Sequence, residues 1–205
     1  VMKVYHHEQS AEEKAASKRG KRSRRKGKLG EKWIADYLRE QLEDMIGPGW
    51  FEVTQRNQGK WSGRYRPEVA IHKWGNYHHH IIHIESKRDE TSSPLAALRQ
   101  AQQDVAPGAV PIAICKRSNE TGIVVCELSN DIIIPYLRTS ETVYARTGAH
   151  LRRSLSSATS KSAGGVALGV LYDLSVCAMW LGDFIQPLRA YLRLWELDSK
   201  GENEP

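Results

Sequence analysis

Two carboxylates and a lysine occupy positions that a β-hairpin brings together. Glu68 opens one expected strand, and Glu85 and Lys87 lie near the end of the next. Gly75 and Asn76 between the two segments favour a tight turn, so we expect the strands to pair antiparallel. Such a hairpin returns the chain to its starting end, and acidic and basic side chains gather there.

The period of two along a strand sharpens this expectation. His83, Glu85 and Lys87 share one face because successive side chains alternate between the faces of a sheet. With a two-residue turn, residue 68 faces residue 83, which places Glu68 diagonally from Glu85 and within reach of it. A different turn length shifts this register.

Two close carboxylates repel each other, and one of them tends to stay protonated. A divalent cation relieves this repulsion, and Mg²⁺ commonly takes one or two protein carboxylates together with a phosphate. Such an ion can polarise a phosphodiester and lower the pKa of a bound water. A lysine beside it can orient that water and offset charge in the transition state. The residue types therefore suit hydrolysis of a nucleic-acid backbone.

The surrounding elements supply a scaffold for this site. Apolar residues at helical spacing predict a helix over 30–46, and Gly47 and Pro48 end it. A strand, a short helix and a buried strand in succession favour a right-handed parallel crossover. The resulting order is α-β-β-β-α-β-β, with strands expected at 50–57, 68–74, 77–88, 110–116 and 121–128 and a second helix at 91–105.

These motifs, in this order, resemble the PD-(D/E)xK nuclease superfamily. The likeness is carried by RPEVA (66–70) before the hairpin and by HIESKRDE (83–90) after it. GEKWIADYL, which begins at Gly30, resembles the first helix of these enzymes. ALRQAQQD (97–104) and the strand ending in CKRSN resemble phage-encoded and archaeal-type Holliday junction resolvases. The similarity covers roughly residues 29–130.

The resemblance implies an α/β, restriction-endonuclease-like core (αβββαβ), with a small mixed β-sheet flanked by helices. It implies an Mg²⁺- or Mn²⁺-dependent endonuclease that acts as a homodimer on branched DNA such as four-way junctions. Glu68 and Glu85 then bind the metal with the backbone carbonyl of Ser86, and Lys87 positions the attacking water. By the same resemblance, Glu31 and Gln100 complete the site. One departure is that relatives carry aspartate where this chain has Glu68.

Cations are concentrated in two segments that suit phosphate contacts. Eight of the eleven residues from 18 to 28 are Lys or Arg, within a chain of formal net charge +6. A second group, interleaved with Trp61 and Tyr65, precedes Glu68. The candidate DNA-binding residues are Lys21, Arg22, Arg24, Arg25, Lys26, Lys28, Arg56, Lys60, Arg64, Arg66, Lys116 and Arg117.

We expect five segments: a basic disordered arm (1–28), the nuclease core (29–138), a polar connector (139–162), a helical C-terminal extension (163–198) and a tail (199–205). The extension is strongly apolar over 164–185, which favours a buried or dimer-forming helix and leaves a membrane segment as an alternative. Three cysteines without CxxC spacing read as small buried hydrophobes. The first 30 residues show no secretory signal, so we expect a cytoplasmic protein.

Several alternatives remain open. The chain could be another PD-(D/E)xK nuclease, such as a nickase or a restriction-like enzyme, or an inactive descendant that only binds nucleic acid. His78, His79, His80 and His83 invite a zinc site, but adjacent residues on a strand point to opposite faces and no cysteine cluster accompanies them. His83, on the expected active face, is a candidate phosphate or water contact.

Overall fold

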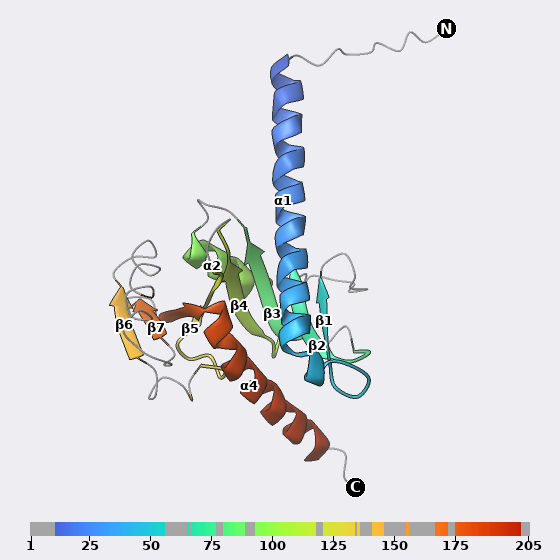
Figure 1. The fold of residues 1–205 in the computed structure, drawn as a ribbon, viewed down its shortest axis with the longest axis vertical. Coiled ribbons are helices and arrows are strands. Elements are labelled where there is room, and N and C mark those ends of the chain that lie inside the picture. The colour runs from blue at the N-terminus through green and yellow to red at the C-terminus, as the bar shows by residue number, and fades with distance from the viewer. Residues whose placement is uncertain are drawn as a thin grey trace.

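The computed structural model shows a mixed β-sheet between helices (Figure 1). The structure describes residues 11–55, 65, 67–76, 80–88, 93–117, 121–133, 135, 141–145, 155, 167–171 and 175–201. Its eight described strands form one sheet in the order β1-β2-β3-β4-β5-β8-β7-β6. The α/β class with a mixed sheet flanked by helices, predicted from the sequence, is confirmed.

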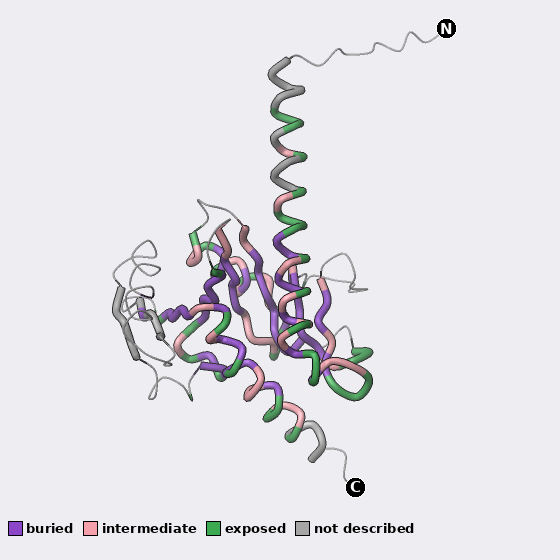
Figure 2. The backbone as a smooth tube through the Cα atoms, viewed as in Figure 1, coloured by how far each residue is buried: buried purple, intermediate pink, exposed green. Residues whose placement is uncertain are grey.

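Helix α1 spans Ala11–Gln41 and is far longer than the sequence predicted. Its C-terminal half packs on β1 and β3, whereas its N-terminal half projects beyond the body of the protein (Figures 1 and 2). Residues 11–28 were expected to be disordered, and this expectation is wrong. Alanine, lysine, arginine and glutamate are favourable helix formers, and the packed half supplies the costly nucleus from which the helix extends.

Strands β1 (Phe51–Gln55), β2 (Val69–Lys73) and β3 (His80–Lys87) form an antiparallel meander, and the predicted antiparallel pairing of β2 with β3 is confirmed. A short 3₁₀ helix, η1 (Glu43–Met45), leads into β1. The guanidinium of Arg39 on α1 donates two hydrogen bonds to the carbonyl of Val53, at 3.1 and 2.9 Å. These bonds occupy a backbone acceptor of β1, which pairs with β2 alone among the described strands.

The crossover predicted after β3 is also present. Helix α2 (Pro94–Asp104) connects β3 to β4 (Val110–Cys115), and the two strands are parallel. Ser93 caps α2 by accepting the N–H of Ala96 at 3.4 Å, and Pro94 occupies the first turn, where its missing N–H costs nothing. Strand β5 (Ile123–Glu127) then pairs antiparallel with β4.

The C-terminal third differs from the prediction. Strands β7 (Ala167–Leu171) and β8 (Val176–Trp180) replace the expected helix over 164–185, and β8 pairs antiparallel with β5. Strand β6 (Glu141–Ala145) falls in the expected polar connector and pairs parallel with β7. Short apolar runs do not distinguish a buried strand from a buried helix by periodicity.

Helix α4 (Leu181–Gly201) completes the fold and contains the amphipathic segment read from the sequence. Phe184, Leu188 and Leu192 are fully buried against the sheet, so much of this apolar surface serves the subunit's own core. Leu194 and Leu197 on the same helix remain exposed. The C-terminal region therefore exposes less apolar surface for a homodimer contact than the sequence suggested.

Alternate residues of the central strands belong to two separate hydrophobic clusters. Ile112 and Ile114 of β4 pack with the residues of α1 and α4, whereas Ala113 and Cys115 pack with Leu98 of α2. Helices α1 and α4 thus cover one face of the sheet and α2 covers the other (Figure 1). We call these the α1 face and the α2 face.

Two further expectations can be compared with the structure. The cysteines Cys115, Cys126 and Cys177 are buried thiols outside any disulfide, as predicted for small hydrophobes. Within the part of the chain that the structure describes, no helix combines the length and apolar character that crossing a membrane requires.

Candidate functional site

Strand β3 ends in the acidic and basic pair singled out from the sequence. Lys87 Nζ donates to Glu85 Oε1 at 2.5 Å, with the Glu85 side chain 2% exposed and that of Lys87 31% exposed. The parallel ladder sets Glu85 beside Ala113 and Lys87 beside Cys115, residues of the α2 face. The predicted shared face of Glu85 and Lys87 is confirmed. Lys87 is thus a cation at the rim of a buried carboxylate.

Glu68 reaches the same place, but by a different register from the one predicted. Val69 pairs with Ile84, and continuing this antiparallel register sets residue 68 directly opposite Glu85 rather than diagonal to it. The predicted pairing with residue 83 is wrong because the ladder shifts between Ile71 and His72 and the last residue of β2 is Lys73, well before β3 begins at His80. In the observed register, Glu68 and Glu85 lie closer together than in the predicted register.

The backbone of β3 holds the Glu68 carboxylate in position. The N–H of Ser86 donates to Glu68 Oε2 at 2.7 Å. Pro67, immediately before Glu68, is buried and restricts the approach of the chain to β2. Because Ser86 lies between Glu85 and Lys87, this bond fixes Glu68 to the motif it was predicted to join.

Burial and neighbouring carboxylates perturb the ionisation of this site. Burial raises the pKa of Glu68, the negative charges of Glu85 and Glu31 raise it further, and Lys87 and the Ser86 N–H oppose the rise; the pKa is about 7. Burial lowers the pKa of Lys87, but its hydrogen bond to Glu85 and the charge of Glu68 outweigh this, so the pKa is raised. Without a bound cation, the Glu68 carboxyl therefore holds its proton more tightly than an ordinary glutamate does.

Helix α1 contributes Glu31 through an unusually close approach to β3. A Cβ atom added at Gly30 would lie 2.9 Å from Arg88 Cβ and 3.5 Å from Ser86 Oγ. Glycine therefore permits α1 to cross the end of β3 at this distance. Glu31 follows directly, is 9% exposed and is close enough to Glu68 to influence its pKa. The structure thus brings together Glu68, Glu85 and Lys87, and Glu31 acts on Glu68 through its charge.

The donor set fits a hard divalent cation with few protein ligands. Glu68 and Glu85 offer carboxylate oxygens, and Ser86 offers a backbone carbonyl, the ligand types that Mg²⁺ prefers. Besides burial, the charges of Glu85 and Glu31 raise the pKa of Glu68, and a bound cation would relieve this repulsion. Among the described residues, no three His, Cys, Asp or Glu side chains form a metal-binding group. Mg²⁺ commonly keeps several waters and needs only one or two protein carboxylates.

Other predicted site residues stand in different positions. Gln100 is half-buried on α2, which packs on β3 and β4 and so covers the face that carries Glu85 and Lys87; its role in the site stays a prediction. His83 is fully buried and paired with Ala70, so the structure does not support its suggested contact with a substrate phosphate.

The predicted DNA-binding residues fall into three groups. Four of them, Arg56, Lys60, Arg64 and Arg66, lie outside the described residues. Lys116 and Arg117 are half-buried at the end of β4, beside Lys87, whose carbonyl accepts the Lys116 N–H at 2.8 Å. The remaining six lie on the projecting half of α1, where the side chains of Arg22 and Arg24 are outside the described set.

On that projecting half, four exposed cations form a line. Residues three or four positions apart share one face of a helix, and this spacing joins Lys18, Lys21, Arg25 and Lys28. We call these four residues the basic stripe. The helix here rises about 1.5 Å per residue, so the stripe extends for roughly 15 Å away from the end of β3.

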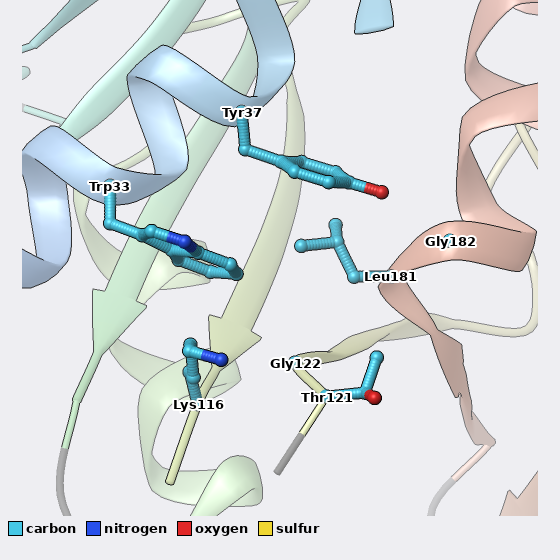
Figure 3. A pocket seen from close by; sticks show the side chains of 7 residues that line it. All are labelled: Trp33, Tyr37, Lys116, Thr121, Gly122, Leu181 and Gly182. Atoms are coloured by element: carbon cyan, nitrogen blue, oxygen red, sulfur yellow. The ribbon is translucent and has the colours of Figure 1, made fainter. Parts of the chain in front are cut away.

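An aromatic cavity beside Lys116 escaped the sequence reading. Trp33 and Tyr37 of α1 line a cavity of about 420 Å³, and their rings stack with centroids 5.7 Å apart (Figure 3). Their helical spacing predicts that both residues lie on the core face of the helix. A signal was present, since two aromatic residues four positions apart occupy one face, but only the fold brings Lys116 to them.

Comparison with protein-family models, with curated proteins and with solved structures finds no match for this chain.

Proposed function

We propose that this chain is a metal-dependent DNA endonuclease of the PD-(D/E)xK type. The observation that carries the proposal is the meeting of Glu68, Glu85 and Lys87 at one end of the sheet, with the Ser86 N–H bonded to Glu68. The order α1-β1-β2-β3-α2-β4-β5 supports a restriction-endonuclease-like core, because it provides the hairpin and parallel crossover that such a core requires.

Each residue has a role that its surroundings support. Glu68 and Glu85, with the Ser86 carbonyl, would hold Mg²⁺ or Mn²⁺, which when bound supplies Lewis-acid polarisation of the phosphodiester. Lys87, at the rim of the buried Glu85, orients the attacking water and offsets the negative charge that develops on the phosphate. Glu31 supports the site from α1, and Gln100 does so from α2.

The substrate assignment rests on charge and on the resemblance to junction resolvases. The basic stripe gives α1 a surface suited to DNA phosphates, and Lys116 and Arg117 add cations near Lys87. Contacts of this kind bind DNA with strong salt dependence and little sequence preference. We therefore propose branched DNA, with a homodimer cutting two strands, as the preferred reaction.

The glutamate at position 68 favours one competing function, an inactive DNA-binding protein. Its longer side chain already accepts the Ser86 N–H, and its pKa near 7 leaves much of it protonated without a cation. A protein of this kind would bind branched DNA without cutting it, so the cleavage assay separates the two functions.

The test is cleavage of labelled DNA under defined metal conditions. A four-way junction, a matched duplex and a flap are incubated with the protein and Mg²⁺, Mn²⁺ or EDTA. We expect cleavage of the junction with either ion and none in EDTA. Lys87→Ala and Glu85→Gln should each lower the rate at least about 100-fold.

Lys73→Ala is a matched control, because Lys73 ends β2 at the opposite end of the sheet, against Trp195. This variant should cut like the parent. Equal activity of the parent and the Lys87→Ala variant would overturn the proposed site. Binding of the junction without cleavage in either metal would establish the inactive alternative.

A further inference from the structure

The cavity beside the proposed site has the composition of a base-binding subsite. Trp33 and Tyr37 form an aromatic wall, Leu181 of α4 closes the apolar side, and Lys116 and Thr121 provide polar groups (Figure 3). Its volume of about 420 Å³ falls within the range of small-ligand sites, about 300–1,000 Å³. This volume is enough for a single base.

A cation already occupies the face of the Trp33 ring. Lys116 Nζ lies 4.5 Å from the ring centroid, a cation–π contact. The lysine side chain is flexible, so it can leave the ring for a phosphate while a base takes its place on the aromatic surface. Cationic and aromatic groups combined in this way bind unpaired nucleotides, because phosphates meet the cation and bases stack on the ring.

Glycine keeps the cavity open. A Cβ atom added at Gly122 would lie 3.4 Å from Leu181 Cδ2 and 3.6 Å from the Trp33 ring. Larger side chains at this position would fill the space between the tryptophan and α4. The Gly122 carbonyl also accepts the Leu181 N–H at 2.8 Å, which fixes the start of α4 as the cavity's far wall.

The cavity adjoins the proposed catalytic lysine across the end of two strands. The Lys116 N–H donates to the Lys87 carbonyl at 2.8 Å, and paired strands are about 4.8 Å apart. Lys87 lies on the α2 face with its partner Cys115, so Lys116, the next residue along β4, points to the α1 face. A DNA strand passing over this end of the sheet can present one phosphate to Lys87 and a neighbouring base to Trp33.

We infer that the Trp33–Tyr37–Lys116 cavity binds one unpaired base of the DNA strand whose phosphate lies at Lys87. The inference rests on the proposed function, and it identifies an unpaired base as the feature of the DNA that this cavity selects. Branch points and frayed ends supply such bases, whereas an intact duplex keeps its bases stacked and paired. The site therefore favours DNA that is unpaired next to the cut.

Binding in EDTA tests this inference without any need for cleavage. The probes are a forked DNA with 2-aminopurine at one unpaired position beside the branch, the same DNA with an abasic site there, and a matched duplex. The structure does not fix which unpaired base enters the cavity, so 2-aminopurine is placed in turn at each of the first three unpaired nucleotides. Stacking on an aromatic ring quenches 2-aminopurine fluorescence, so the probe reports the contact directly.

We expect quenching at one position and about 5- to 100-fold weaker binding of the DNA that is abasic there. Trp33→Leu should lose the quenching and bind fork DNA about 5- to 100-fold more weakly, with unchanged duplex affinity. Trp33→Phe should retain both, because phenylalanine still offers a stacking surface. Trp74→Leu is the matched control, since Trp74 is exposed on the β2–β3 connection.

Two results would overturn the inference. One refutes the base subsite alone, and the other also refutes the proposed function. Tight fork binding that is insensitive to the abasic site and to Trp33→Leu would refute the base subsite alone. The abasic comparison uses the unaltered protein, so it holds even if Trp33→Leu fails to fold. If the parent binds neither fork nor duplex at low salt, the DNA-directed function fails and the subsite fails with it.

Discussion

The charge of Glu68 should make the stability of the metal-free protein depend on pH. Its pKa of about 7 in the folded protein compares with an ordinary value of 4.5. The folded state thus holds the proton more tightly than the unfolded state, and stability falls as pH rises from about 4.5 to about 7. The gap between the two pKa values corresponds to at most about 3 kcal/mol.

Glu68→Gln should remove this dependence. Glutamine keeps an oxygen acceptor for the Ser86 N–H and cannot ionise. We expect the variant and the parent to differ least near pH 4.5, and the variant to gain up to about 3 kcal/mol relative to the parent by pH 8. Urea unfolding in EDTA at several pH values, with a linear extrapolation, measures the gain.

Glu43→Gln serves as the control, because Glu43 is an exposed glutamate in η1. Its stability difference from the parent should stay constant over the same pH range. A Glu68→Gln curve parallel to that of the parent from pH 4.5 to 8 would refute the reasoning. Such a result would mean that Glu68 is solvated in the folded protein and does not meet Glu85.

Three further predictions concern the elements around the site. Gly30→Ala should force α1 away from Arg88 and lower the rate of Mg²⁺-dependent DNA cleavage. Gly27→Ala is the control, because its added Cβ meets nothing within 4 Å, and it should leave this rate unchanged. Changing all four cations of the basic stripe to glutamine should reduce the slope of log affinity against log salt by up to about 4, and an unchanged slope would exclude phosphate contacts there. Phe184→Ala should cost about 3–5 kcal/mol in urea unfolding, and Leu194→Ala, 59% exposed, at most about 0.5; equal losses would contradict the docking of α4.

The region from Gly30 to Glu127 was predictable because its local signals agree with its tertiary contacts. The period of two along β3 placed Glu85 and Lys87 on one face, and the apolar run of β4 indicated the parallel crossover. The register of Glu68 was not predictable, since it depends on a register shift between Ile71 and His72 and on the connection between β2 and β3, which the Gly75-Asn76 pair does not determine. Even so, an error of two residues keeps the same face, and the carboxylates still meet.

The C-terminal third was misread for a different reason. Its apolar stretch predicts a helix by length and composition, but it contains two five-residue strands, with Ser175 at φ 49° before the second. Their partners are distant in sequence, as when Cys177 pairs with Cys126, and local patterning has no information about such pairing. The aromatic cavity was missed likewise, because it needs Lys116 and Leu181 beside Trp33.

The addition of β8 to β5 bears on how copies of this chain can assemble. An open strand exposes unpaired N–H and C=O groups, and these favour edge-to-edge pairing and aggregation. Pairing with β8 removes that opportunity at β5, and the Arg39 guanidinium blocks one carbonyl on the outer strand β1. Two subunits therefore cannot join by continuing the sheet through β5, so a symmetric pair must meet through helices, loops or the outer strands. The distance between the two proposed sites would then depend on those contacts and not on strand pairing at β5.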